Sequence, residues 1–76
     1  MKTVLEILTE IRPEFDFTGS EDFIEEGLLD SYDVVTLVCD IETNYAISIE
    51  GVDILPENFR NVAAIKALLQ RYGIQQ

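Results

Sequence analysis

Residues 30–45, DSYDVVTLVCDIETNY, carry the clearest helical pattern in the chain. At 100° per residue, five apolar side chains fall within one arc and form the expected core face: Val34, Leu37, Val38, Ile41 and Tyr45. Asp30 and Ser31, at the N-terminal end of the stretch, are residue types that favour a helix start. The pattern therefore predicts an amphipathic helix from about Ser31 to Tyr45.

A helix is also predicted before this stretch, from about Thr3 to Arg12. Thr3 and Glu6 have the spacing of a capping box, and Pro13 disfavours a helical conformation at Arg12. One apolar stripe runs along this segment: Val4, Ile7, Leu8 and Ile11.

The C-terminal part predicts a last helix that begins near Asn61, a good N-cap, and ends before Gly73. Its apolar side comprises Val62, Ile65, Leu68, Leu69 and Tyr72. A short helical turn is expected over residues 56–59, because proline suits a first helical position. We therefore predict one all-α domain over residues 1–76, a small bundle of three main helices plus one short helix.

Two connections join these helices. The first, residues 13–29, holds apolar side chains that are expected to pin it onto the helices: Phe15, Phe17, Phe23, Ile24, Leu28 and Leu29. Gly27 is a plausible turn position within it. The second runs from about Ala46 to Pro56 and contains the alternating sequence ISI at 47–49. A lone strand would have no partner, so an extended loop is predicted there.

The charge of the chain restricts its partners. The formal net charge is −10, with only five Lys and Arg residues, which argues against nucleic acid and against an anionic membrane surface. A basic protein partner fits this charge best. No signal peptide or segment of membrane-spanning length is visible, and Cys39 is the only cysteine, so a cytoplasmic protein is expected.

The residue types needed for most enzyme chemistry are missing. The chain has no histidine, so it has no Ser-His pair and no imidazole metal site. Asp22 to Asp33 has the length of a calcium-binding loop, with Gly27 at its sixth position. However, Ile24 stands where an oxygen ligand is needed, and the last position is not the longer Glu. We predict neither a metal site nor an enzyme.

Ser31 is the candidate site of chemistry. No Lys or Arg lies between Glu14 and Phe59, whereas thirteen of the fifteen carboxylates fall in that range. With no base nearby in sequence, the hydroxyl is a poor nucleophile, but it is a suitable place for another enzyme to attach a group. The simpler alternative is that Asp30 or Ser31 only caps the helix.

The run EGLLDSYDVV, residues 26–35, closely resembles the attachment motif of acyl carrier proteins. The resemblance continues in order through LV at 37–38, IE at 41–42, ISI at 47–49, PENF at 56–59, NV at 61–62 and Ile65. Tyr32 stands where carriers of fatty-acid synthesis usually have Leu, and Thr36 and Thr43 stand where they often have Glu. The chain is more similar to stand-alone aminoacyl carriers, such as D-alanyl carrier proteins, or to carriers of secondary metabolism.

The resemblance implies a function for Ser31. A phosphopantetheinyl transferase would move 4′-phosphopantetheine from coenzyme A onto this serine, with Asp30 as part of the recognised motif. The thiol of the arm would then carry an acyl or aminoacyl group as a thioester. A loading ligase or acyltransferase and a downstream synthase or transferase would be the further partners of a monomeric carrier. The family fold is a bundle of three principal helices and one short helix.

A docking surface is predicted on the face of the 31–45 helix opposite the core. Tyr32 and Cys39 lie there, with Val35 and Glu42 along one flank and Asp33 along the other. The pattern allows either exposure of Tyr32 and Val35 or their burial beneath the first connection. No cation lies near Cys39 in sequence to activate its thiol, so we interpret this residue as structural or as part of the docking surface.

A second hypothesis belongs to another functional class. The chain would be a small acidic helical adaptor that binds a basic protein and carries nothing. Ser31 would then serve only as a helix cap. Attachment of phosphopantetheine at Ser31 discriminates the two hypotheses.

Overall fold

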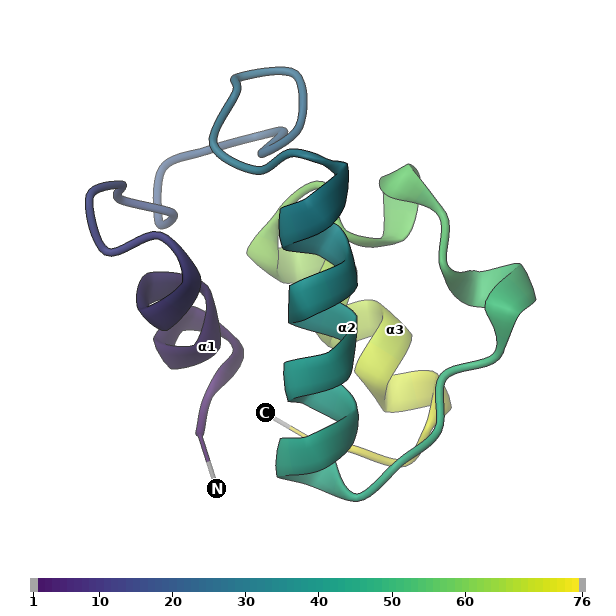
Figure 1. The fold of residues 1–76 in the computed structure, drawn as a ribbon. Helices are drawn as coiled ribbons and strands as arrows, with labels where there is room; N and C mark the ends of the chain where they lie inside the picture. Colours follow the sequence, from purple (N-terminus) through teal and green to yellow (C-terminus); the bar gives the residue numbers. More distant parts are fainter. Residues whose placement is uncertain (1, 76) are drawn as a thin grey trace.

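The computed structural model describes residues 2–75 and contains no strand within that range, which confirms an all-α fold. Its elements are α1 (Val4–Ile11), α2 (Ser31–Tyr45), the 3₁₀ turns η1 (Gly51–Asp53) and η2 (Pro56–Asn58), and α3 (Val62–Arg71). Helix α1 contacts both α2 and α3. Figure 1 shows α2 between α1 on one side and the η1–η2 connection on the other, with α3 behind it.

The helix boundaries follow the predicted caps. At α1, the backbone N–H of Glu6 donates to Thr3 Oγ1 at 3.2 Å, and the N–H of Thr3 donates to Glu6 Oε1 at 3.0 Å. Asn61 caps α3 by accepting from the N–H of Ala64 at 2.7 Å. Gly27 and Gly73 both have positive φ, as their turn and stop positions require. Local chemistry therefore sets where the helices begin and end.

The core is made by all three helices and by both connections. Its buried apolar residues are Val4, Ile7, Leu8, Phe17, Phe23, Leu29, Leu37, Val38, Ile41, Tyr45, Ile49, Phe59, Ile65, Leu68 and Leu69. The long first connection is thus packed, as predicted. Phe15 is an exception, because it is 36% exposed, and Val34 is only half-buried although it lies on the predicted core arc. No helix within residues 2–75 is long and apolar enough to cross a membrane.

The second connection differs from the prediction. It contains η1 at Gly51–Asp53, which the sequence analysis missed, and the expected short helix is the single 3₁₀ turn η2 at Pro56–Asn58. Polar contacts attach η1 to the end of α3, because the hydroxyl of Tyr72 donates to Asp53 Oδ2 at 2.6 Å and accepts from the N–H of Glu50 at 3.0 Å. Such long-range contacts have no periodic signature in the sequence.

Ala46 ends α2 in the left-handed conformation, with φ of +54°. This conformation is unfavourable for any residue with a Cβ and is the one that glycine adopts freely. We expect Ala46→Gly to raise the free energy of unfolding by about 0.5–1 kcal/mol. Urea denaturation of both proteins measures the difference. Ala67→Gly, at an exposed position inside α3, is the matched control and should lower stability by about 1 kcal/mol. A loss of stability in Ala46→Gly would contradict the prediction.

Candidate functional site

Ser31 is the first residue of α2 and is exposed to solvent. Asp30 is the N-cap: its side chain accepts from the N–H of Asp33 at 2.9 Å, and its own N–H donates to Asp33 Oδ2 at 3.2 Å. The capping task, which the sequence left open between Asp30 and Ser31, is therefore carried out by Asp30. Among the described residues the hydroxyl of Ser31 makes no hydrogen bond to the protein, so it is free to react.

The first turn of α2 also offers backbone donors. The N–H groups of Asp30 and Asp33 are used by the capping box, but those of Ser31 and Tyr32 have no carbonyl partner in the helix because they precede the first i to i−4 bond. Unpaired N–H groups and the positive end of the helix dipole favour an anion at this position.

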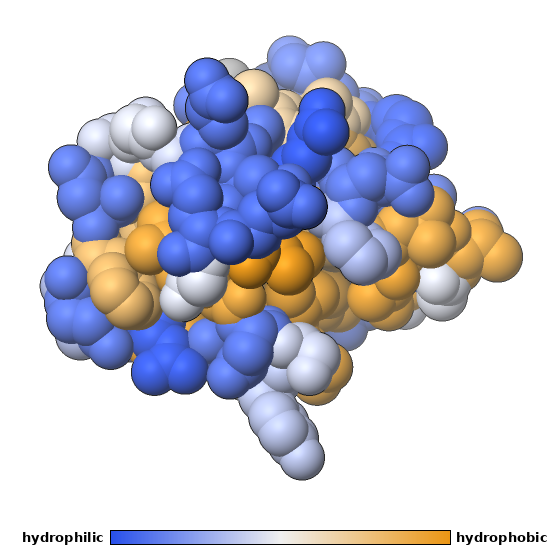
Figure 2. Space-filling view, turned by 90° about the horizontal axis from the view of Figure 1, so that it is seen from above, coloured by the Kyte–Doolittle hydropathy of each residue, from blue (hydrophilic) through white to orange (hydrophobic). Residues whose placement is uncertain are grey.

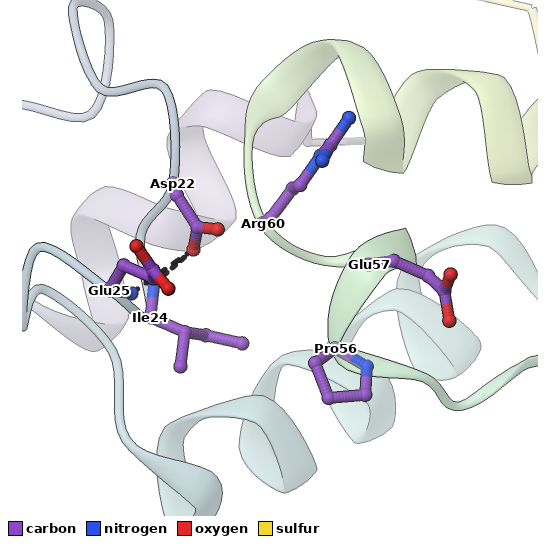
Figure 3. A pocket seen from close by; sticks show the side chains of 6 residues that line it. All are labelled: Asp22, Ile24, Glu25, Pro56, Glu57 and Arg60. Carbon is purple, nitrogen blue, oxygen red and sulfur yellow. Dashed lines mark hydrogen bonds between the residues drawn. The ribbon is translucent and has the colours of Figure 1, made fainter.

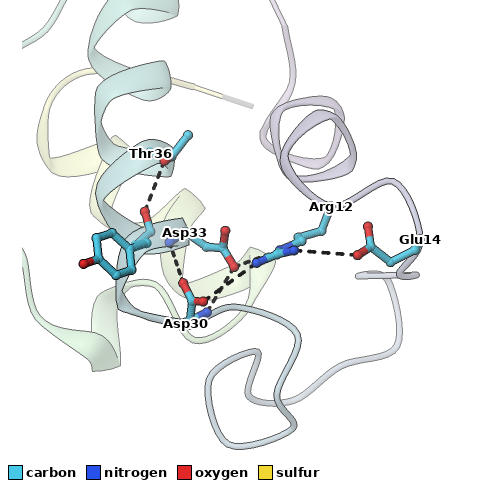
Figure 4. A network of polar contacts seen from close by, with 6 residues as sticks. Arg12, Glu14, Asp30, Asp33 and Thr36 are labelled. Atoms are coloured by element: carbon cyan, nitrogen blue, oxygen red, sulfur yellow. Dashed lines mark hydrogen bonds and ion pairs between the residues drawn. The ribbon is translucent and has the colours of Figure 1, made fainter.

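Arg12 lies beside this turn, which the sequence analysis did not foresee (Figure 4). Its Nε donates to Asp33 Oδ2 at 2.9 Å, while Nη2 lies 3.8 Å from Asp30 Oδ2 and Nη1 lies 3.8 Å from Glu14 Oε2. The absence of Lys and Arg between Glu14 and Phe59 therefore does not leave the site without a cation, because Arg12 precedes that range and reaches the site through space. Arg12 follows α1, and the packing of α1 on α2 bridges the 21 positions that separate it from Asp33.

Asp33 is not the exposed flank of a docking face that the helical pattern predicted. It is only 9% exposed and is held by Arg12 and by the capping box. Burial acts to raise the pKa of Asp33, but the hydrogen bonds from Arg12 and the Asp30 backbone, together with the charge of Arg12, outweigh burial and hold the pKa below its ordinary value of 3.8. Asp33 is therefore a structural carboxylate at neutral pH.

This pKa shift predicts how stability depends on pH. Because the folded-state pKa of Asp33 lies below the unfolded value, its stabilising effect is complete above about pH 4 and is lost as the pH falls through the folded-state pKa. We expect Asp33→Asn to be less stable than wild type at neutral pH, with the difference shrinking as the pH falls below about 4. Urea midpoints measured from neutral to strongly acidic pH test this. A difference that does not depend on pH would contradict it.

The structure divides the other predicted docking residues into two groups. Tyr32 and Val35 are 83% and 60% exposed, so the first connection does not bury them. Cys39 is an exposed free thiol. Glu42 is half-buried, and its Oε2 accepts from the N–H of Ile49 at 2.8 Å. Glu42 therefore stabilises the segment that follows α2, while its side chain stays partly exposed on the predicted docking face.

An apolar groove lies next to Ser31, with a volume of about 280 Å³. It is lined by Ile24, Asp30, Ser31, Val34, Val35, Ile54, Leu55 and Pro56. Ile54 and Leu55 lie between η1 and η2, and Pro56 begins η2, as its predicted position in a short helical turn requires. The sequence analysis did not assign these three residues to a docking surface. Val52, 75% exposed, extends the apolar surface of this connection. Figure 2, which views the molecule from above Figure 1, shows this apolar surface on the right, beside a mainly hydrophilic centre.

A second hollow borders the same connection and is more polar (Figure 3). It is lined by Asp22, Ile24, Glu25, Pro56, Glu57 and Arg60. Asp22 Oδ1 accepts from the N–H groups of Ile24 and Glu25 at 3.0 and 3.1 Å, so this carboxylate stabilises a turn. Within residues 2–75, no group of Cys, Asp or Glu side chains has an arrangement suited to a metal ion.

Comparison with protein-family models, with curated proteins and with solved structures finds no match to this chain. Function must therefore be inferred from the motif around Ser31 and from the geometry of the first turn of α2. Three features meet there: a free exposed hydroxyl, an apolar groove and an arginine among carboxylates.

Proposed function

We propose that this chain is a carrier protein in which Ser31 bears 4′-phosphopantetheine and transports acyl or aminoacyl groups between enzymes. The observation that supports this most is the state of the Ser31 hydroxyl. It lies exposed at the first position of α2, in the Asp-Ser motif, yet Asp30 performs the capping that would otherwise explain a serine there. Within the described residues, the Ser31 side chain makes no hydrogen bond that would indicate a purely structural role.

The residues around Ser31 fit a phosphodiester. The unpaired N–H groups of Ser31 and Tyr32 and the helix dipole favour negative charge, and Arg12 offsets part of the charge of Asp30 and Asp33. When attached, the arm supplies a thiol that binds the cargo as a thioester. The chain itself needs only to present the serine, to resist unfolding and to offer a surface to its partners.

The exposed apolar residues near Ser31 form the proposed docking surface: Tyr32, Val35, Val52, Ile54 and Leu55. Asp30 and Glu57 are exposed acids at its edge, although Asp30 also caps α2 and lies 3.8 Å from Arg12. They join the half-buried Glu42 of the docking hypothesis, whereas the buried Asp33 no longer belongs to it. A partner with an apolar patch and a basic rim fits this surface. We expect such a patch on the phosphopantetheinyl transferase, on the loading ligase or acyltransferase, and on the downstream synthase or transferase. We place these encounters in the cytoplasm and the carrier as a monomer.

Intact mass spectrometry tests the proposal. The folded protein is incubated with coenzyme A and each of two broad-specificity phosphopantetheinyl transferases, and the proposal requires a mass gain of one phosphopantetheine unit. Each transferase is first shown to modify another carrier. If the chain gains no mass with either active enzyme, the carrier function is refuted.

The adaptor hypothesis has one specific observation in its favour. The same apolar surface, on a chain of net charge −10, also suits a protein that only binds a basic partner. An adaptor binds equally well with Ser31→Ala and accepts no phosphopantetheine. The mass measurement therefore separates the two functions.

A further inference from the structure

We propose that Arg12 is a positioning residue for the modified serine: its guanidinium, held in place by Asp33, is the counter-charge for a phosphodiester on Ser31. This inference rests on the proposed function of Ser31. It assigns a role to a residue that lies outside the Asp-Ser motif and at the end of a different helix.

The hydrogen bonding of Arg12 leaves donors available. Of the guanidinium nitrogens, only Nε donates a hydrogen bond to a described residue, and its acceptor is Asp33. Nη1 and Nη2 lie 3.8 Å from Glu14 and Asp30, which is beyond hydrogen-bond length. The side chain is 37% exposed, so these N–H groups are accessible. Figure 4 shows the guanidinium directed from the end of α1 at the first turn of α2.

Charge balance explains why such a residue is needed. An anion on Ser31 would follow Asp30 directly in sequence and share the helix turn with Asp33, and like charges this close repel one another. Within residues 2–75, Arg12 is the cation that lies within 4 Å of both of these carboxylates. Arg60 lines the second hollow, Lys66 and Arg71 lie on α3, and Lys2 pairs with Glu10. Guanidinium also suits phosphate oxygens, because its planar N–H groups match their geometry.

A purely structural role for Arg12 makes a different prediction. If Arg12 only neutralised Asp33, its loss would destabilise the unmodified and the modified protein equally. The difference in melting temperature between modified and unmodified protein then isolates any interaction of Arg12 with the added group.

The experiment uses four proteins: wild type, Arg12→Gln, Asp33→Asn and the double variant Arg12→Gln/Asp33→Asn. Each is melted before and after phosphopantetheine attachment. We expect the modified-minus-unmodified melting temperature to fall by about 4 °C, relative to wild type, in both proteins that lack Arg12. Asp33→Asn keeps the guanidinium and loses only the carboxylate that holds it, so its fall should be smaller. The double variant has the same net charge as wild type. A change in its temperature difference therefore cannot result from a change in net charge. The double variant also removes both members of the ion pair, so it leaves no unpaired buried carboxylate if Arg12→Gln alone fails to fold.

Two further measurements complete the test. Lys66→Gln removes the same charge from an exposed position of α3 and should leave the temperature difference unchanged. The ³¹P resonance of the phosphodiester should shift in Arg12→Gln and not in Lys66→Gln, and Arg12→Lys should restore part of both effects. Equal temperature differences in all proteins would overturn the role of Arg12 while the carrier function stands. Failure to modify wild type at all would instead refute the carrier function, and the inference with it.

Discussion

Ser31→Ala is expected to abolish phosphopantetheine attachment completely while leaving the fold intact. The substitution removes the only atom of Ser31 that can form the phosphodiester. The fold should not depend on that atom, because the side chain is exposed and Asp30 caps the helix. Alanine is also a good helix former, so the change in unfolding free energy should stay within about 0.5 kcal/mol. Intact mass after incubation with coenzyme A and transferase, together with thermal melting, measures both expectations.

Ser48→Ala is the matched control for this experiment. Ser48 is also an exposed serine, but it lies in the connection after α2 and outside the Asp-Ser motif. Its variant should gain mass as wild type does. If Ser31→Ala still gained one phosphopantetheine unit, the modified residue would be elsewhere and the assignment of Ser31 would be wrong.

Phe23→Ala is expected to have the largest effect on stability. Phe23 is 0% exposed although it lies in a connection, and its ring packs edge-on against Phe17 with centroids 5.1 Å apart. Its backbone carbonyl also accepts from the N–H groups of Leu28 and Leu29, so it anchors the segment that leads into Ser31. Truncation of a buried phenylalanine costs about 3–5 kcal/mol, which is comparable to the stability that a single core of this size supplies. Circular dichroism and urea titration should show a largely unfolded protein.

Phe15→Ala controls for the loss of an aromatic ring from the same connection. Phe15 is 36% exposed and makes a more distant edge contact with Phe17, at 6.5 Å. We expect this variant to lose less than about 1 kcal/mol. If both variants were equally mild, the first connection would not be part of the core, contrary to the structure.

Short-range chemistry explains which parts of this fold could be predicted. The start of α1 at Thr3–Glu6, the Asn61 cap of α3 and the turn at Gly27 depend on atoms within a few residues of one another, so the sequence displays them directly. The helical period likewise identified the buried face of α2, apart from the half-buried Val34. The capping box of Asp30 and Asp33 is equally short-range, but an acidic pair at this spacing beside a serine left two candidate caps in the sequence.

Other features of the site depend on contacts between segments that are distant in sequence. Helical projection placed Asp33 and Glu42 at the edge of a solvent-exposed face. However, a projection does not include contacts with other segments of the chain. Arg12 reaches Asp33 from α1, and Glu42 accepts from the backbone of Ile49 after the chain has turned back. Asp33 is thereby buried in an ion pair, whereas Glu42 uses one oxygen to hold the backbone of the second connection. The groove exists because residues 54–56 lie opposite α2.

The three α-helices, the Thr3 and Asn61 caps and the serine at the head of α2 can be predicted from the sequence, because local hydrogen bonds and side-chain periodicity fix these features within one or two helical turns. The tertiary structure alone decided which charges around Ser31 remain free. That outcome depends on how α1 packs against α2 and on where residues 54–56 lie across the groove, and both features join residues whose separation in sequence carries no pattern.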